Sequence, residues 1–181
     1  KLIYGKNDWL LNNKKFSKDN ISINEIRELL INRGILLILN DLILEKKNLT
    51  VDDRKIIIKH MVKAIIGYGE SLLFSHNKYH WSYKKKSHLI ETIDIKNNHF
   101  LKLYKNALNF RFFPNYEPFT DRNLRFMSKA LKRNLQKIHL QIEKNLTANP
   151  RFEWRTLEKS LLENPFYGSR FNIYNILLLF K

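Results

Sequence analysis

One segment of the sequence, residues 67–86, gathers residue types that bind polar ligands. Glu70 is the only acidic residue between Asp53 and Glu91. Aromatic and basic residues follow it closely, a combination suited to stacking on bases and holding phosphates. We predict a nucleotide or polar-substrate site here, formed by Glu70, Tyr79, Tyr83, Lys84 and Lys85. The alternative is a buried helix end followed by a solvated loop.

Glu70 is an acidic residue in a segment that is otherwise expected to be buried. Because it sits among such residues, its carboxylate is expected to be hydrogen-bonded, paired or protonated. Gly67 and Gly69 each destabilise a helix by roughly 1 kcal/mol relative to alanine. They indicate the close approach of another backbone, a kink, or room for a ligand.

A second group of residues forms a basic ridge on a predicted helix over residues 121–146. The helix has an apolar stripe at three- and four-residue spacing, and cations run beside that stripe. Twelve basic and three acidic residues lie between positions 95 and 151, which makes this part the predicted polyanion surface. The basic ridge consists of Arg122, Arg125, Lys129, Lys132, Arg133 and Lys137.

The stretch from Arg133 to His139 resembles the arginine and histidine motif of HEPN ribonucleases. In that family a helical-bundle dimer cuts RNA with the two residues at the dimer cleft. Six residues at 100° each place Arg133 and His139 about 120° apart on one helix. A kink or a second subunit would be needed to bring them together.

Metal and nucleophile chemistry find little support. His76 and His80 are four residues apart but lie past a predicted helix end with no carboxylate nearby, so we predict no metal site. No glycine-rich phosphate loop and no cysteine occur. The missing cysteines exclude disulfides and thiolate sites, and they favour a cytoplasmic setting.

The elements that must position these residues are helical. Of 181 residues, 44% are hydrophobic and 28% charged, which is typical of a globular domain. We predict a single all-α bundle of about six to eight helices. Its members are expected near residues 23–45, 51–74, 83–92, 96–110, 121–146, 152–163 and 170–180, with an aromatic loop at 110–119.

The second of these helices is predicted to be the buried central one, since residues 56–74 are apolar on nearly every side. Capping residues mark several helix starts. Ser22 with Glu25 has the form of a capping box, Thr50 or Asp52 can cap the second helix, and Ser82 can cap the third.

Several short motifs in residues 1–95 resemble, in order and spacing, the helical region C-terminal to the catalytic core in some bacterial nucleotidyltransferase-like proteins. They are Tyr4-Gly5-Lys6, Leu30-Ile31-Asn32-Arg33 with Leu36-Leu37, Lys63 followed by Gly69-Glu70-Ser71-Leu72-Leu73, and Lys78-Tyr79-His80-Trp81-Ser82-Tyr83-Lys84. The family's core carries a Gly-Ser turn and paired aspartates, which are not evident here. The resemblance implies a companion domain, with residues 96–181 as a basic extension.

The leading functional prediction is therefore a non-catalytic helical companion of a nucleotidyltransferase, contributing to nucleotide or polar-substrate binding and to RNA contact. In this reading Mg²⁺ and a nucleoside triphosphate belong to a full-length protein with a catalytic domain or partner chain. Two alternatives are a HEPN-like ribonuclease using Arg133 and His139, and a basic RNA-binding or scaffold module without enzymatic activity. The net charge of +16 favours a polyanionic partner; the alternative explanation is an AT-rich genome, which enriches Lys, Asn and Ile. Attachment to a membrane surface is a weaker choice.

Overall fold

The computed structural model describes residues 20–95 and 98–155. Within these residues the protein is all-α, with five α-helices, one 3₁₀ turn and no strand. The helices are α2 (Ile23–Leu44), α3 (Val51–Ser75), α4 (Tyr83–Leu89), α5 (Asn98–Phe112) and α6 (Asp121–Leu146), with the 3₁₀ turn η3 (Ile90–Thr92) after α4.

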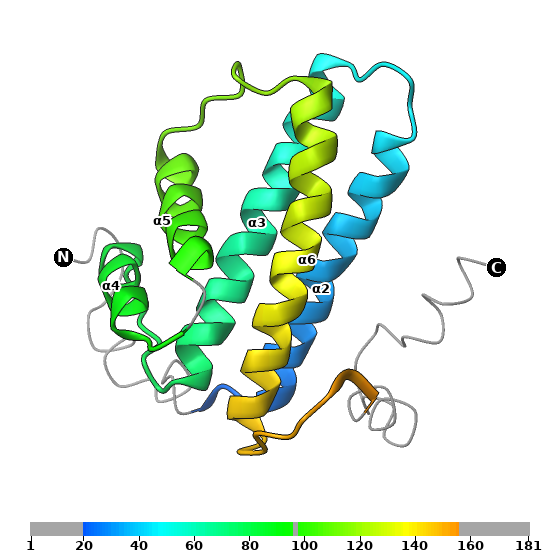
Figure 1. Cartoon of the computed structure of the whole chain (residues 1–181). Helices are drawn as coiled ribbons and strands as arrows, with labels where there is room; N and C mark the ends of the chain where they lie inside the picture. The colour runs from blue at the N-terminus through cyan, green and yellow to red at the C-terminus, as the bar shows by residue number, and fades with distance from the viewer. Residues whose placement is uncertain (1–19, 96–97, 156–181) are drawn as a thin grey trace.

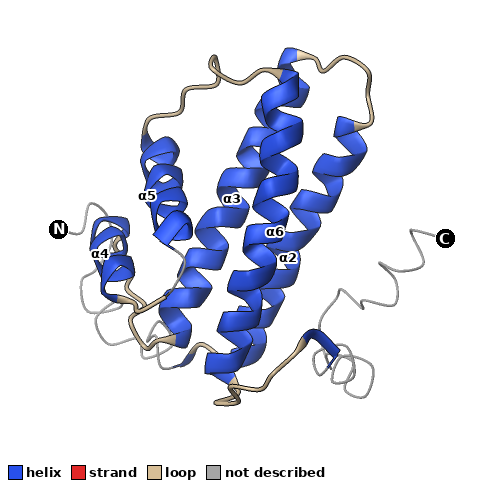
Figure 2. Ribbon diagram, viewed as in Figure 1, coloured by secondary structure: helices blue, strands red, loops and turns tan. Residues whose placement is uncertain are grey.

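Three long helices, α2, α3 and α6, lie side by side and form the body of the bundle (Figure 1). The shorter α5 packs against α3, and α4 lies near the end of α3 against α3 and α5 (Figure 2). The chain runs one way along α2 and α5 and the opposite way along α3 and α6 (Figure 1). None of the described helices is both long enough and apolar enough to cross a membrane.

The helix starts follow from local capping. Ser22 and Glu25 form the predicted capping box on α2, in which each side chain accepts from the other residue's backbone N–H. Thr50 forms a second box with Asp53 at the start of α3, so Thr50 and not Asp52 is the cap. Ser82 caps α4.

The core is formed by buried apolar side chains of α2, α3, α5 and α6. Ile57, Ile65 and Leu72 are all buried, and α3 packs against α2, α5 and α6. The helix is not apolar on every side, however. Ile56 is 41% exposed, and Lys59 on the same side is also exposed, because no other described helix covers this part of α3.

The two glycines of α3 make room for side chains from two different helices. A Cβ on Gly67 would lie 2.6 Å from Cγ of Arg33 on α2. A Cβ on Gly69 would lie 2.1 Å from Cδ2 of Tyr104 on α5. The sequence predicted the close approach of another backbone, a kink or room for a ligand. At both positions the nearest atoms belong instead to a side chain of a neighbouring helix.

Several predicted boundaries are wrong. Five α-helices are described in place of six to eight, since the two helices expected at 152–163 and 170–180 lie almost wholly outside the described residues. The helix after Ser82 ends at Leu89 and tightens into η3. Helix α5 continues to Phe112 because Pro114 restricts only the residue before it, so the aromatic loop starts at Phe113.

Candidate functional site

The lone acid of the 67–86 segment has a partner inside the protein. Lys86 of α4 donates a short hydrogen bond from Nζ to Oε1 of Glu70 on α3. The Lys86 side chain is only 3% exposed and that of Glu70 is 18% exposed. A buried ammonium needs such a carboxylate, so this ion pair fixes α4 on α3.

Aromatic rings complete the surroundings of this ammonium. Lys86 Nζ lies 4.8 Å from the ring centre of Tyr79 and 4.4 Å from that of Tyr83. Both distances suit a cation–π interaction. Burial, followed by the charge of Glu70, raises the pKa of the Tyr79 hydroxyl. We call Glu70, Tyr79, Tyr83 and Lys86 the Lys86 cluster.

The structure thus brings together three of the five residues predicted to bind a ligand here, and it does so around a lysine that the prediction omitted. Lys84 and Lys85 lie on exposed positions of α4 and take no part in the cluster. A helical projection could have identified Lys86, since it shares one face of α4 with Tyr83 and the buried Ile90.

The basic ridge of α6 divides into two sides. On one side, Arg125 donates to the backbone oxygens of Leu44 and Lys46, where α2 ends, and Lys132 Nζ lies 2.5 Å from Oδ2 of Asp41. Helix α2 has no basic residue in its own last turn, so Arg125 supplies the positive charge that a helix C-terminus favours. These two cations hold α2 and α6 together.

The other side of the ridge lines a groove of about 700 Å³ between α5 and α6. Lys129, Arg133 and Lys137 are exposed at its rim and make no hydrogen bond or ion pair with any described residue. The lining contains no acidic side chain. The groove residues are Ile95, His99, Phe126, Lys129, Ala130, Arg133, Asn134, Lys137, Ile138 and Gln141. We call this the α5–α6 groove.

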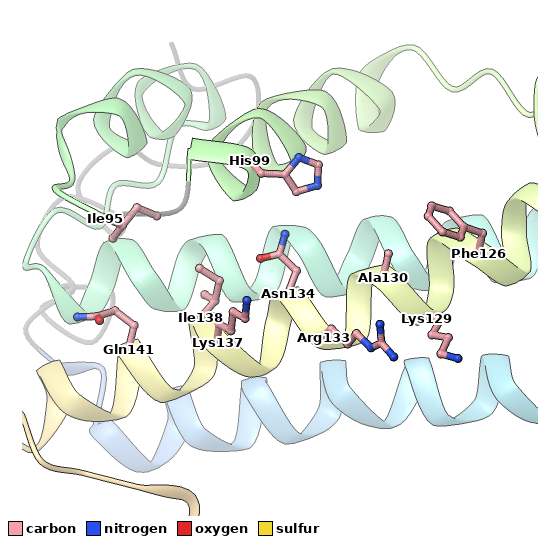
Figure 3. Close-up of a pocket in the computed structure, with 10 residues that line it drawn as sticks. All are labelled: Ile95, His99, Phe126, Lys129, Ala130, Arg133, Asn134, Lys137, Ile138 and Gln141. Carbon is pink, nitrogen blue, oxygen red and sulfur yellow. The ribbon is translucent and has the colours of Figure 1, made fainter.

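Side chains that line the groove point in two directions, either across the groove or away from α5 (Figure 3). Figure 3 shows His99 extending from α5 toward α6 and Asn134 extending from α6 toward α5. Lys129 and Arg133 leave α6 on the side away from α5 (Figure 3). Phe126, at one end, is 75% exposed. Neither His99 nor Phe126 was predicted from the sequence, although an exposed phenylalanine beside a basic ridge is itself a signal for binding.

His139 lies on a different side of α6 from Arg133. Its Nδ1 is 3.4 Å from the hydroxyl of Tyr68 on α3, and its ring packs edge-on against Trp154. Glu143, one turn further, forms a bidentate ion pair with Arg27 of α2 at 2.7–3.2 Å. Burial lowers the pKa of the His139 imidazole, and burial raises the pKa of Tyr68 to about 12. Within one chain, Arg133 and His139 do not share a site.

The other residues that the sequence analysis considered belong to neither the Lys86 cluster nor the groove. Arg122 is exposed on the first turn of α6. His76 Nε2 accepts from Asn145 at 2.8 Å, and His80 Nδ1 accepts from the Ser82 backbone at 2.9 Å. Across the described ranges no three His, Asp or Glu side chains are grouped to hold a metal ion. The Tyr4-Gly5-Lys6 motif lies outside the described residues.

Comparisons with protein-family models, with curated proteins and with solved structures find no match to this chain.

Proposed function

We propose that this chain is a nucleic-acid-binding helical module whose contact surface is the α5–α6 groove. The observation that carries the proposal is the row formed by Lys129, Arg133 and Lys137. These cations are exposed, unpaired among the described residues and free of acidic neighbours in the groove lining. Cations without internal partners are the ones available to phosphates.

The spacing of this row fits an extended polyanion. Residues four apart on a helix are about 6 Å apart along its axis, so the three cations form a line and not a single cluster. A line of charges follows a phosphate backbone better than it encloses one phosphate. We take α3 as the central helix of the bundle, which would hold α5 and α6 at a fixed separation.

Salt dependence of RNA binding tests the proposal. The full chain is titrated into a fluorescent twelve-nucleotide oligouridylate at several salt concentrations. In the triple variant Lys129→Gln, Arg133→Gln and Lys137→Gln, we expect weaker binding and a log–log salt slope smaller by about 2, because three single-strand phosphate contacts are lost.

A matched variant controls for net charge. Lys47→Gln, Lys84→Gln and Lys85→Gln also remove three exposed cations, away from the groove. We expect this variant to keep nearly the full slope. Equal losses in both variants would mean that binding follows overall charge, and a loss only in the control would locate the site at Lys47 or on α4. Either result contradicts the proposal.

Two other functions stay predictions. The companion role beside a nucleotidyltransferase core rests on the resemblance in residues 1–95 and is compatible with RNA contact through the groove. A HEPN-like ribonuclease would require Arg133 of one subunit to meet His139 of another. Cleavage of the oligouridylate by the full chain, abolished in His139→Ala, would support that alternative.

A further inference from the structure

An apolar pocket of about 260 Å³ opens from the α5–α6 groove. It shares His99, Phe126, Ala130 and Asn134 with the groove. The rest of its lining is apolar and comes from α3, α5 and α6: Met61, Ile65, Leu103, Met127 and Leu131. The groove thus has an apolar recess beside its cationic rim.

The recess exists because α5 packs mainly on α3. The buried side chains of Phe100, Tyr104 and Leu108 hold α5 in place, and the room that Gly69 leaves for Tyr104 allows the two helices to approach closely. Ala130 is a small residue on the wall facing α5 (Figure 3). A larger side chain at that position would fill the space.

We propose that this recess receives an unpaired nucleobase while the cationic row holds the adjoining phosphates. This inference rests on the proposed function and specifies its ligand as single-stranded nucleic acid. A nucleotide has an anionic phosphate on one side and a flat base with apolar faces on the other. The groove likewise has a cationic rim on one side and an apolar recess on the other. Lys129 and Arg133 leave α6 away from α5, whereas Ala130 and Asn134 of the recess face α5 (Figure 3).

The mouth of the recess suits a base in two further respects. The exposed imidazole of His99 lies there and can meet the polar edge of a base. The exposed ring of Phe126 offers a surface on which a base can stack. A duplex keeps its bases paired and stacked inside, so it could use the cations but not the recess.

Three ligands with equal numbers of phosphates test the inference on the full chain. They are a twelve-nucleotide oligouridylate, the corresponding abasic oligomer, and a duplex with twelve phosphates contributed by its two strands together. We expect the oligouridylate to bind about 5- to 150-fold tighter than the abasic oligomer, the range that stacking of one base gives. The duplex should resemble the abasic oligomer.

A filled recess provides the matched variant. Ala130→Leu occupies the space at an exposed position of α6, so the fold should tolerate it. We expect this variant to lose most of the preference for oligouridylate and to bind the abasic oligomer as before. Gln136→Leu, also exposed on α6 but outside the groove lining, should keep the preference.

The outcomes separate the two proposals. Equal binding of all three ligands, with the salt slope still dependent on Lys129, Arg133 and Lys137, would overturn the base-binding recess and leave the polyanion site. Unchanged preference in Ala130→Leu would likewise overturn the recess. Absence of salt-dependent binding to any ligand would overturn both.

Discussion

The Lys86 cluster and the α5–α6 groove are built from the same residue types, cations beside aromatic rings, yet they use them in opposite ways. In the cluster the ammonium of Lys86 is buried, paired with Glu70 and covered by two tyrosine rings. In the groove the cations of Lys129 and Arg133 are exposed and unpaired among the described residues. Residue type indicates which interaction a side chain can form. Whether that side chain can also bind a ligand depends on whether it is already paired inside the protein.

Removing the carboxylate from the Lys86 cluster should have the largest effect on stability. Glu70→Gln leaves the buried ammonium of Lys86 without its counter-charge, and we expect the free energy of unfolding to fall by about 3 kcal/mol. Chemical denaturation measured by circular dichroism checks this. Adding Lys86→Met to Glu70→Gln removes the stranded charge and should recover much of the loss.

The exposed neighbour of that lysine supplies the control. Lys85→Met should change stability by less than about 0.5 kcal/mol. If Glu70→Gln were as stable as the parent and instead weakened RNA binding, the segment would be a ligand site after all, and the contrast between the two regions would be lost.

The glycines of the bundle should respond oppositely to one added methyl group. Gly69→Ala forces a Cβ against the ring of Tyr104, and we expect a loss of about 2 kcal/mol from overpacking. In Gly34→Ala the added Cβ lies an ordinary 3.7 Å from the Tyr68 hydroxyl, and the change should stabilise α2 by about 0.5–1 kcal/mol.

Thermal or urea denaturation of the two variants measures this difference directly. Because Tyr104 also holds α5 beside the recess, Gly69→Ala should weaken oligouridylate binding more than Gly34→Ala does. Equal stabilities for the two variants would show that α5 does not lie as close to α3 as described.

The smallest expected effect is a pH dependence of the stability, caused by the largely buried His139 of α6. Burial lowers the pKa of His139, whose ring is surrounded by Tyr68, Glu143 and Arg27. The unfolded chain binds this proton near pH 6.5, while the folded chain stays neutral to lower pH. Stability from this group is therefore fully present above pH 6.5 and decreases as the pH falls below it.

One histidine limits the slope to about 1.4 kcal/mol per pH unit. His139→Gln should flatten the stability curve between pH 7 and 5, although His60 and His76, whose pKa values burial also lowers, contribute in the same direction. Measuring the variant at pH 8 gives the packing cost alone. A curve as steep as that of the parent would contradict the assignment.

Sequence reasoning succeeded where the cause was local. The cap at Ser22 follows from residues within a few positions of the helix start, and the extent of α6 follows from its repeated apolar spacing; both are confirmed. The alternation of apolar and basic residues on α6 likewise predicted which side is buried, since helical periodicity alone determines it.

It failed where a partner is distant in the chain. The binding of Glu70 to Lys86 spans a loop, and Arg125 meets the end of α2 from 81 residues away. The groove depends on how α5 sits on α3, which in turn depends on the pairing of Gly69 with Tyr104. These contacts arise from tertiary packing. Helical spacing could have placed Lys86 on the buried face of its helix, but it could not identify Glu70 as the partner of Lys86.

The contacts between α2 and α6 also set the order in which the bundle can be completed during synthesis. Arg27 is separated from Glu143 by 116 positions, and Lys132 from Asp41 by 91. Helices α2 and α3 are joined by a short connection and can pair as soon as both have left the ribosome. The apolar surface of α2 and α3 that α6 covers in the bundle remains exposed to water until α6 has been synthesised. Over that interval the nascent chain presents an apolar face that chaperones recognise and that favours aggregation.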